Sequence, residues 1–396
     1  LFPYTTLFRS RVESIAQGYF SMSMNTIKYH IAYSDLKSFF GNNPLFIFPT
    51  NTFGGHEVMT IGIIESLLIS GCNVTVAIEP NNVSLKKKIS QYDKLNNFIL
   101  PIKQGRFEFL HALFNIYKIY KANRFLKKIS QDGYSSIIIV QGDIELGSIY
   151  VNAAHTLNLP FISYIPYAHT AKKMGKKLSF LRDLYYPFIY RRIKEYLTIS
   201  DIFKDEIKAF SPSSNIYVLK NKVRDVSAFH ERRKLHNSKD NKKLYHIAVI
   251  GRVNFKQKGH DILLEAINRL SNESRKYIIV DIVGTGPDLK RLQSLVSSSD
   301  LEKHFIFHGW QTEPWEKVYL DDALIIPSRF EGVPLVMLEG ISIGMDILAS
   351  NADGMRDYLP ENVLFNDSKE LSILLEKKIN QKLLKLKIAK GGNNNE

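Results

Sequence analysis

Residues 328–344 read SRFEGVPLVMLEGISIG and contain two glutamates, Glu331 and Glu339, with seven residues between them. Pro334 suits the first turn of a helix, because its missing N–H costs nothing there and its fixed φ is already helical. The apolar run after it is therefore predicted as a helix, and a helix start offers free backbone N–H groups that attract phosphate. Carboxylates beside a phosphate site indicate a second kind of contact, and hydroxyls are their natural donors. Phosphate and polyol together describe a nucleotide sugar.

The length and composition of the chain predict a globular protein of two domains. Its 396 residues favour two domains over one, and a hydrophobic content of 44% suits packed cores. Cys72 is the single cysteine, so no internal disulfide can form and a reducing, cytoplasmic compartment is predicted. The sequence has no run of about 18 apolar residues, so no membrane-spanning helix is predicted.

The first residues need separate treatment. Residues 1–10, LFPYTTLFRS, resemble the translation of a sequencing adapter and lack the apolar core and cleavage site of a signal peptide. We therefore exclude residues 1–21 from the fold as an artefact or a leader, and expect the authentic start at Met22 or Met24.

The net charge of +14 is distributed unevenly along the chain. Residues 1–240 contain 32 Lys and Arg against 18 Asp and Glu, whereas residues 241–396 contain 21 of each group. A basic first half indicates an anionic partner for that half.

Short apolar runs alternate with amphipathic stretches, a pattern that predicts parallel, doubly wound sheets. In a first domain, residues 22–220, strands are expected at 43–49, 73–78, 137–141, 161–165 and 196–199, and helices at 56–70, 107–130, 147–157 and 177–194. Residues 221–243 are polar without an apolar period and are expected to be a linker. In a second domain, residues 244–396, strands are expected at 245–250, 277–283, 305–308, 323–327 and 347–350, and helices at 259–270 and from Asp288. Two such domains place a ligand cleft at the carboxyl ends of their strands.

Six sequence motifs then occur in one order: GGHE (54–57), LTIS (197–200), GRVNFKQKGHDILLEAI (251–267), IVGTGPDLKRL (282–292), HGWQ (308–311) and EGVPLVMLEGISIG (331–344). Together they resemble glycosyltransferase family 4, retaining enzymes of the GT-B architecture. The resemblance covers roughly residues 45–365 and is strongest in the second half. It implies an α/β fold of two doubly wound, Rossmann-like domains that face a central cleft.

By this resemblance, four residues would serve catalysis. Arg252 and Lys258 would hold the donor's diphosphate, whose negative charge grows as the glycosidic bond breaks. Glu331 would bind hydroxyls of the transferred sugar, and His169 would orient sugar or acceptor hydroxyls. The alternatives are solvated surface cations for Arg252 and Lys258 and a structural role for His169. Lys256 is expected to be a solvated neighbour.

The resemblance also implies a set of substrate-binding residues. Glu339 would accept both ribose hydroxyls, with a plain helix acid as the alternative. The other members of the set would contact the sugar, the phosphates or the base: Gly332, Val333, Pro334, Gly54, Gly55, Gly284, Gln311 and Thr312. Simple strand-to-helix turns are the alternative for the glycines of both halves. Leu289 stands where a dinucleotide fingerprint needs its third glycine, so NAD binding is rejected.

Two carboxylates, Asp143 and Glu145, follow an expected strand of the first half. They either bind acceptor hydroxyls or cap the helix near Gly147, and capping is favoured. The second half departs from the family pattern at Met345-Asp346, where Gly-x-Pro is usual, and at Gly340, where alanine is common. The C-terminal helix is also expected to be short.

Two stretches, residues 107–128 and 172–194, combine Lys and Arg with Phe and Tyr. Basic amphipathic helices with aromatic side chains suit an anionic membrane face. The alternative, that the rings pack on the sheet while the lysines are solvated, is at least as well supported for residues 107–128. No nucleic-acid-binding module is recognisable, so nucleic acid is not an expected partner.

These observations predict a cytoplasmic enzyme, peripherally associated with the inner face of the plasma membrane. It would move a sugar from a UDP- or GDP-sugar to a growing surface polysaccharide (capsule, O-antigen or exopolysaccharide) or a lipid-linked glycan. No cofactor and no metal are expected. The alternatives are a nucleotide-sugar epimerase of GT-B architecture and a non-catalytic basic adaptor for membrane or nucleic acid.

Overall fold

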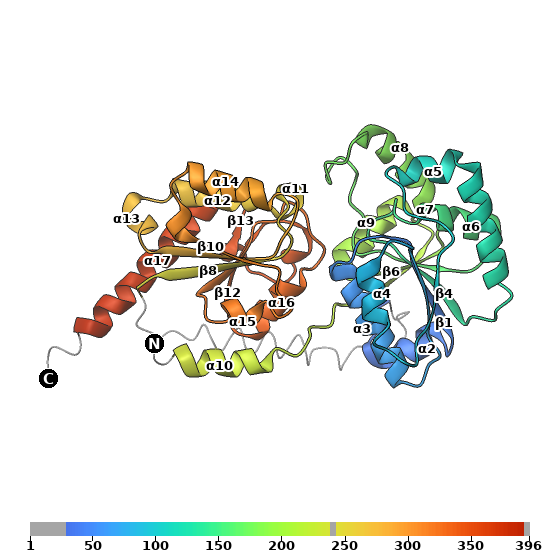
Figure 1. Ribbon diagram of the computed structural model, residues 1–396, viewed down its shortest axis with the longest axis horizontal. Coiled ribbons are helices and arrows are strands. Elements are labelled where there is room, and N and C mark those ends of the chain that lie inside the picture. Colours follow the sequence, from blue (N-terminus) through green and yellow to red (C-terminus); the bar gives the residue numbers. More distant parts are fainter. Residues whose placement is uncertain (1–28, 238–242, 392–396) are drawn as a thin grey trace.

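The computed structural model describes residues 29–237 and 243–391, which form two parallel β-sheets with helices on both faces of each (Figure 1). The expected fold class, two doubly wound Rossmann-like domains, is confirmed. The expected leader, residues 1–21, and the candidate start residues Met22 and Met24 lie outside the described residues.

The first sheet has seven strands in the order β3-β2-β1-β4-β5-β6-β7, and every neighbouring pair is parallel. The strands are β1 (Pro44–Phe48), β2 (Thr75–Ile78), β3 (Asn96–Ile99), β4 (Ser136–Val140), β5 (Ile162–Tyr164), β6 (Glu195–Thr198) and β7 (Asn215–Val218). All five residues of β1 are buried, as a central strand covered on both faces requires. The sequence pattern did not predict β3 and β7, which are the two edge strands.

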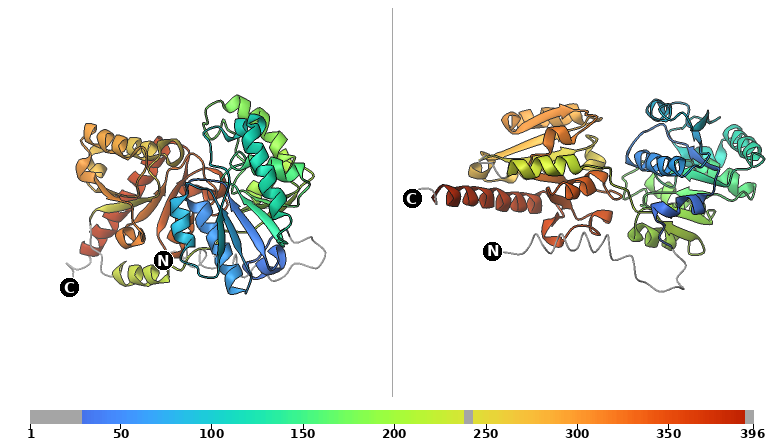
Figure 2. Two further views of the ribbon diagram at one scale, coloured as in Figure 1. Left: turned by 45° about the vertical axis from the view of Figure 1, so that its right-hand side comes forward. Right: turned by 90° about the horizontal axis from the view of Figure 1, so that it is seen from below.

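Helices of the first domain cover both faces of this sheet (Figures 1 and 2). They are η1 (Tyr33–Asp35), α2 (Leu36–Phe40), α3 (Gly55–Ile69), α4 (Val83–Ile89), α5 (Glu108–Phe114), α6 (Ile116–Ile129), α7 (Ser148–Thr156), α8 (Ser179–Tyr190) and α9 (Asp201–Phe210). The single helix expected over residues 107–130 is two helices. Asn115 separates them, because its side-chain oxygen accepts a hydrogen bond from the backbone N–H of Lys118 and so begins α6 (3.0 Å).

The second sheet has six parallel strands in the order β10-β9-β8-β11-β12-β13. They are β8 (Tyr245–Ile250), β9 (Ile278–Val283), β10 (Phe305–Gly309), β11 (Ala323–Ile326), β12 (Asp346–Ser350) and β13 (Leu364–Phe365). The helices are α11 (Phe255–Lys258), α12 (His260–Arg269), α13 (Asn272–Arg275), α14 (Leu289–Ser298), η2 (Glu302–His304), α15 (Trp315–Val318), α16 (Leu335–Ser342), η3 (Asp353–Met355), η4 (Glu361–Val363) and α17 (Ser368–Gly391). The last helix has 24 residues and packs along α12, so the expectation of a short C-terminal helix is wrong.

The segment between the sheets contains a helix, α10 (Ser227–Asn237), where a linker without apolar period was expected. Two residues of α10 face the second domain. The side chain of Phe229 is buried, and the Arg233 guanidinium donates to the backbone oxygens of Tyr319 (2.8 Å) and Asp321 (2.6 Å). The helix therefore packs on the second domain (Figure 1). The limits 22–220, 221–243 and 244–396 stay a prediction.

The two sheets approach each other through the loops at the carboxyl ends of their strands. Ile199, which follows β6, and Val333, which follows β11, belong to one buried apolar cluster. A Cβ placed on Gly332 would lie 3.1 Å from Ile199 Cδ1, so the two domains are in contact at this point. Among the described residues, no helix has the length and apolar character that crossing a bilayer requires.

Two glycines with the same backbone conformation give a test of this packing. Gly259 (φ 63°) and Gly309 (φ 64°) are both left-handed, but a Cβ on Gly259 would lie 1.9 Å from the Pro327 backbone oxygen, while a Cβ on Gly309 meets no atom within 4 Å. We expect Gly309→Ala to cost about 1–2 kcal/mol, the cost of the left-handed conformation alone. Gly259→Ala should cost at least about 2 kcal/mol more, because backbone must move. Urea unfolding measures both variants, and equal losses would contradict the close approach.

Candidate active site

Lys258 and Glu331 form an ion pair that joins two loops of the second domain. Lys258 is the last residue of α11, and Glu331 follows β11. The ammonium of Lys258 contacts one carboxylate oxygen of Glu331, and the Ser328 hydroxyl donates to the same oxygen (2.9 Å). The Glu331 side chain is 9% exposed and that of Lys258 is 25% exposed, so the pair is largely shielded but still reachable by a ligand. The structure thus brings these two predicted residues together.

Arg252 lies on the loop after β8 and is exposed. It forms no ion pair with any residue that the structure describes, so its guanidinium is free for an anionic ligand. A Cβ on Gly284 would lie 1.9 Å from the Gly251 backbone oxygen, so the loops after β8 and β9 touch at this glycine. A Cβ on Gly251 would lie 3.8 Å from Lys258 Cε. Arg252, Lys258 and Gly284 therefore share one end of the second sheet.

The Gly332–Val333–Pro334 turn leads into α16. The helix begins at Leu335. Pro334 was expected in its first turn but is the residue that precedes the helix (φ −62°, ψ 125°). Val333 is buried, and its backbone oxygen accepts a hydrogen bond from the Asn221 side chain (3.0 Å). The turn is therefore fixed from the interdomain segment as well as from its own helix.

Glu339 is buried inside α16 and holds two hydrogen-bonding partners. Its carboxylate accepts from Arg224 Nε (2.7 Å) and from the Trp315 indole N–H (2.6 Å). Arg224 also contacts Glu313 through both terminal nitrogens (2.7 and 2.9 Å). Sequence reasoning missed Arg224, because it lies in a segment that reads as a linker and belongs to no motif.

Gln311 and Thr312 follow β10 at the same end of the sheet. The Gln311 amide donates to the backbone oxygen of His308 (2.7 Å), which fixes its side chain against the strand end. Thr312 is exposed, and the next residue is Glu313, the second partner of Arg224. Their contact with a base stays a prediction.

Gly54 and Gly55 are exposed at the start of α3, a helix of 15 residues. The Gly54 N–H donates to the carboxylate of Glu57 (2.8 Å). Burial raises the pKa of Glu57, although hydrogen bonds from Gly54 and Thr50 partly oppose the shift. Burial also lowers the pKa of His56 to about 4, so this ring is neutral near pH 7. The Gly54–Gly55 loop therefore offers backbone groups at the start of α3, and the neutral His56 adds no positive charge there.

His169 connects the two domains. Its Nε2 lies 2.8 Å from a carboxylate oxygen of Asp353 in the second domain, and its Nδ1 lies 3.4 Å from Glu206. The Lys173 ammonium contacts the other oxygen of Asp353. Burial of the ring opposes charge on His169, but the two carboxylates outweigh it, so the pKa of His169 is raised. Burial opposes charge on Asp353 as well, but His169 and Lys173 outweigh it and lower the pKa of Asp353.

Asp353 was missed by sequence reasoning, although a positional signal existed. It lies three residues after β12, at the same carboxyl edge of the sheet as the other site residues. His169 also packs edge-on against Phe330 (ring centroids 6.3 Å apart), the neighbour of Glu331. The predicted histidine therefore lies beside the Glu331 loop, with an interdomain ion pair as its observed partner.

Asp143 supports the capping interpretation, while the binding of acceptor hydroxyls by Asp143 and Glu145 stays a prediction. Asp143 accepts from the backbone N–H groups of Glu145 (2.9 Å) and Leu146 (3.2 Å), so it caps the turn before α7 rather than the helix itself. Its second oxygen lies 2.8 Å from the ammonium of Lys176. Glu145 is buried against Arg182.

Two groups among the described residues have the spacing that a metal ion could use: His169, Glu206 and Asp353, and His246, Asp281 and Asp321. In the first group, the Lys173 ammonium already occupies one oxygen of Asp353. In the second, Asp281 accepts from His308 Nε2 at 2.6 Å. Metal independence therefore stays a prediction.

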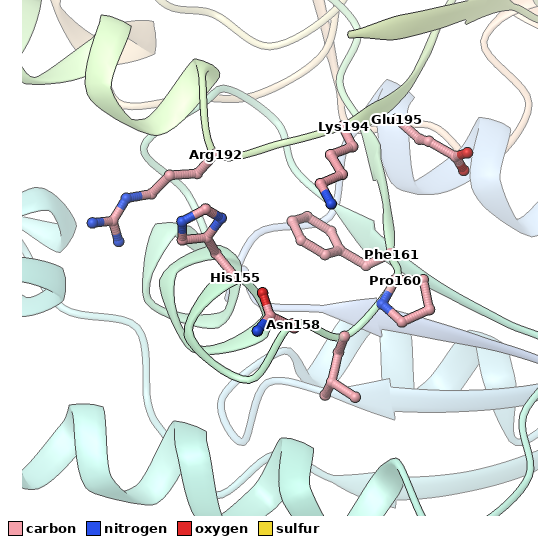
Figure 3. Close-up of a pocket in the computed structure, with 8 residues that line it drawn as sticks. His155, Asn158, Pro160, Phe161, Arg192, Lys194 and Glu195 are labelled. Atoms are coloured by element: carbon pink, nitrogen blue, oxygen red, sulfur yellow. The ribbon is translucent and has the colours of Figure 1, made fainter.

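A small concavity of about 160 Å³ lies away from these residues (Figure 3). His155, Phe161, Arg192 and Lys194 line it, at the amino ends of β5 and β6. Ligands of doubly wound sheets bind at the carboxyl ends of the strands, so this concavity is not part of the candidate site.

Comparison with solved structures identifies the fold as GT-B. The chain is similar to Anabaena HepE, solved in complex with UDP and glucose, with a TM-score of 0.64, 15% identity and coverage of 86% of this chain and 91% of that one. At this identity the likeness shows the fold alone.

The family of the second domain follows from a family model. The model described as "Glycosyl transferases group 1" matches residues 230–392, so this part of the chain is a group 1 glycosyl transferase domain. Two relatives are lipopolysaccharide 1,6-galactosyltransferase of Salmonella typhimurium (32% identical, 28% of this chain and 31% of that protein) and protein CapJ of Staphylococcus aureus (31% identical, 35% of each). The matches span about a third of the length of these relatives.

The raised pKa of His169 predicts a pH-dependent contact between the domains. Because the pKa is raised above its ordinary value of about 6.5, the stabilisation is full below that value and is lost as the pH rises through the raised pKa. Asp353, with its lowered pKa, stays charged over this range. We expect the difference in thermal unfolding midpoint between wild type and His169→Gln to shrink from about pH 6 to about pH 9. His155→Gln, at an exposed histidine, is the control, and a difference independent of pH would contradict the assignment.

Proposed function

We propose that the protein is a retaining glycosyltransferase that uses a UDP- or GDP-sugar. The observation that carries the proposal is the ion pair of Lys258 with Glu331 beside the exposed Arg252, at the carboxyl ends of β8 and β11. The cations Arg252 and Lys258 match a diphosphate, and the buried carboxylate of Glu331 matches sugar hydroxyls. A nucleotide sugar carries both groups in one ligand. The presence of UDP and glucose in the HepE structure supports this choice of donor.

The proposed mechanism is a front-face displacement. As the bond from the sugar to the diphosphate breaks, its electron pair and negative charge pass to the diphosphate, where Arg252 and Lys258 stabilise it. Binding of the diphosphate would draw Lys258 away from Glu331, which frees the carboxylate to accept sugar hydroxyls. A donor phosphate oxygen would take the proton of the acceptor hydroxyl, which forms the new bond on the same face.

Glu339 fits a ribose site, but its carboxylate is already engaged. Arg224 bridges Glu339 and Glu313, and hydrogen bonds to both outweigh partial burial, so the pKa of Arg224 is raised. Ribose hydroxyls can donate to the remaining lone pairs of Glu339 while Arg224 and Trp315 hold its orientation. Arg224 is thereby a positioning residue in this proposal.

The acceptor class in this proposal is a surface polysaccharide or a lipid-linked glycan. The name of the first relative, a lipopolysaccharide 1,6-galactosyltransferase, supports glycan assembly of this kind. The galactosyl donor of the first belongs to that enzyme, and the sugar used by this chain is left open. Cytoplasmic location at the inner face of the plasma membrane is part of the same proposal.

An exposed apolar surface on the first domain supports membrane attachment. On α8, Phe180 is 78% exposed and Leu184 71% exposed, and at the junction of α5 with α6, Phe114 and Ile116 are 72% and 81% exposed. Figures 1 and 2 show α8 beside α5. The same two stretches of the chain carry exposed lysines and arginines: Lys172, Lys173, Lys177, Arg124, Lys127, Lys128 and Arg191. Exposed apolar side chains on helices that also carry cations match an anionic lipid surface.

The exposure of these side chains corrects, in part, the sequence prediction for residues 107–128. For residues 107–128, packing of the rings on the sheet was at least as well supported as exposure. Phe109 is buried, as that reading requires, but Phe114, Tyr117 and Tyr120 are 59–72% exposed. Arg182, counted among the surface cations of the second stretch, is instead buried.

Substitutions at the ion pair test the activity. Lys258→Ala and Glu331→Gln should each lower sugar transfer from the nucleotide sugar by about 100-fold or more, because a charge that stabilises the leaving group or the sugar is lost. Lys290→Ala, an exposed lysine of α14, should leave transfer unchanged. Product formation from radiolabelled UDP- and GDP-sugars measures the effect. Full transfer by both site variants would refute the assignment.

The exposed apolar surface of α8 predicts that charged substitutions there reduce membrane binding. The double variant Phe180→Asp/Leu184→Asp should lose most of its binding to vesicles that contain anionic lipid, because two inserted side chains become charged. Leu384→Asp, at an exposed leucine of α17 (58%), is the control and should bind as wild type does. Vesicle flotation measures binding, and equal losses in both variants, or tight binding of the wild type to neutral vesicles, would contradict the proposal.

A further inference from the structure

A pocket of about 330 Å³ lies where the first domain meets Lys256 of α11. The rest of its wall comes from residues 104–108, 143–146 and 176–182, which follow β3, β4 and β5. A Cβ on Gly175 would lie 2.7 Å from Lys256 Cε, so the loop before α8 closely approaches the second domain, as Figure 1 shows. Lys256 is therefore more than the solvated neighbour that the sequence suggested. None of the predicted donor-binding residues lines this pocket.

The floor of the pocket is a network of paired charges. Lys176 donates to Asp143 (2.8 Å) and to Glu145 (3.2 Å), and Arg182 contacts Glu145. Burial opposes charge on Lys176, but Asp143 and Glu145 outweigh it, so its pKa is raised and it remains an ammonium. Asp143, Glu145 and Arg182 are buried, and each charge has an opposite partner. The network fixes the positions of these side chains in the pocket wall, and its positive and negative charges largely cancel.

Three further cations of the lining have no such partner. Arg106, Lys177 and Lys256 are exposed, and none forms an ion pair with the residues described by the structure. The lining contains five Lys and Arg against three Asp and Glu, a surplus of two positive charges. Glu108, the third acid, accepts from the backbone N–H of Gly105 and lies 4.0 Å from the ammonium of Lys118, so its charge also has a partner. The pocket therefore favours an anionic ligand.

Other lining groups suit a sugar ring. Gln104 accepts a hydrogen bond from the backbone N–H of Asn51 (2.7 Å) through its oxygen, which leaves its amide hydrogens for ligand hydroxyls. Phe107 offers an aromatic ring whose centroid lies 5.7 Å from the guanidinium of Arg106 and 5.5 Å from that of Arg182. The volume lies at the lower end of the roughly 300–1,000 Å³ typical of ligand pockets, which suits one monosaccharide unit.

We propose that this pocket binds one anionic monosaccharide unit of the acceptor, a sugar that carries a phosphate or a carboxylate. Arg106, Lys177 and Lys256 would hold the anionic group, and Gln104 and Phe107 would hold the ring. Because Lys256 belongs to the second domain, the anionic unit would also bridge the domains next to the donor loop. This inference rests on the proposed function, since an acceptor has meaning only for a transferase.

Binding of small sugars to the full chain tests the inference. Glucose 6-phosphate, glucuronate, methyl glucoside and inorganic phosphate are each titrated by calorimetry in the presence of UDP or GDP, whichever binds the wild type. We expect glucose 6-phosphate or glucuronate to bind at least 10-fold more tightly than methyl glucoside and inorganic phosphate. The double variant Lys177→Ala/Lys256→Ala should lose at least 10-fold of that affinity, whereas Lys127→Ala/Lys128→Ala, exposed lysines of α6, should retain it.

The outcomes separate this inference from the proposed function. Equal binding of neutral and anionic sugars, tight binding of inorganic phosphate alone, or no loss in the Lys177/Lys256 variant would each overturn the anionic acceptor pocket. The affinity for UDP or GDP, whichever binds the wild type, should be the same in wild type and in both double variants when measured by the same method. If neither UDP nor GDP binds the wild type, the proposed function fails, whatever the sugars do.

Discussion

The close contact between Gly259 and the Pro327 backbone oxygen determines the geometry of the candidate site. It brings the end of α11 against the end of β11, and this places Lys258 beside Glu331. No side chain fits between the two backbones, so the distance between the loops is set by atoms that cannot rotate away. The backbone contact therefore places Lys258 and Glu331, which belong to different loops, within reach of each other.

The first domain adds to this arrangement through polar contacts that cross the cleft. His169 and Lys173 meet Asp353, and Asn221 and Arg224 in the interdomain segment hold Val333 and Glu339. These contacts involve charged or strongly polar groups that a ligand with phosphates and hydroxyls can compete for. If the proposed donor binds here, we expect it to compete for these side chains and so to couple donor binding to the domain arrangement.

Strands that lie inside a sheet were predictable, but three of the four edge strands, β3, β7 and β13, were not. The edge strand β10 was predicted, at residues 305–308. The expected limits of β8, residues 245–250, agree with the structure, because both faces of this strand are covered and five of its six residues are apolar. β3 and β7 are short edge strands with exposed polar side chains such as Asn96 and Asn215, which weaken their apolar signal. The break at Asn115 was missed for a related reason, since its signal is one hydrogen bond rather than a period.

The sequence by itself determined the α/β class and the two doubly wound sheets. The choice of Arg252, Lys258, Glu331 and Glu339 rested on the family resemblance, and their membership of one site stays a prediction, in which the structure shows the contact of Lys258 with Glu331. Local rules suffice for the sheets, because strand-to-helix loops after parallel strands converge on one edge whatever the details of packing. Only the tertiary structure decided the partners: Arg224 for Glu339, Asp353 for His169, and Lys256 for the pocket of the first domain. Each of these pairs joins residues far apart in the chain, and neither periodicity nor composition records which loops of two separate sheets come into contact.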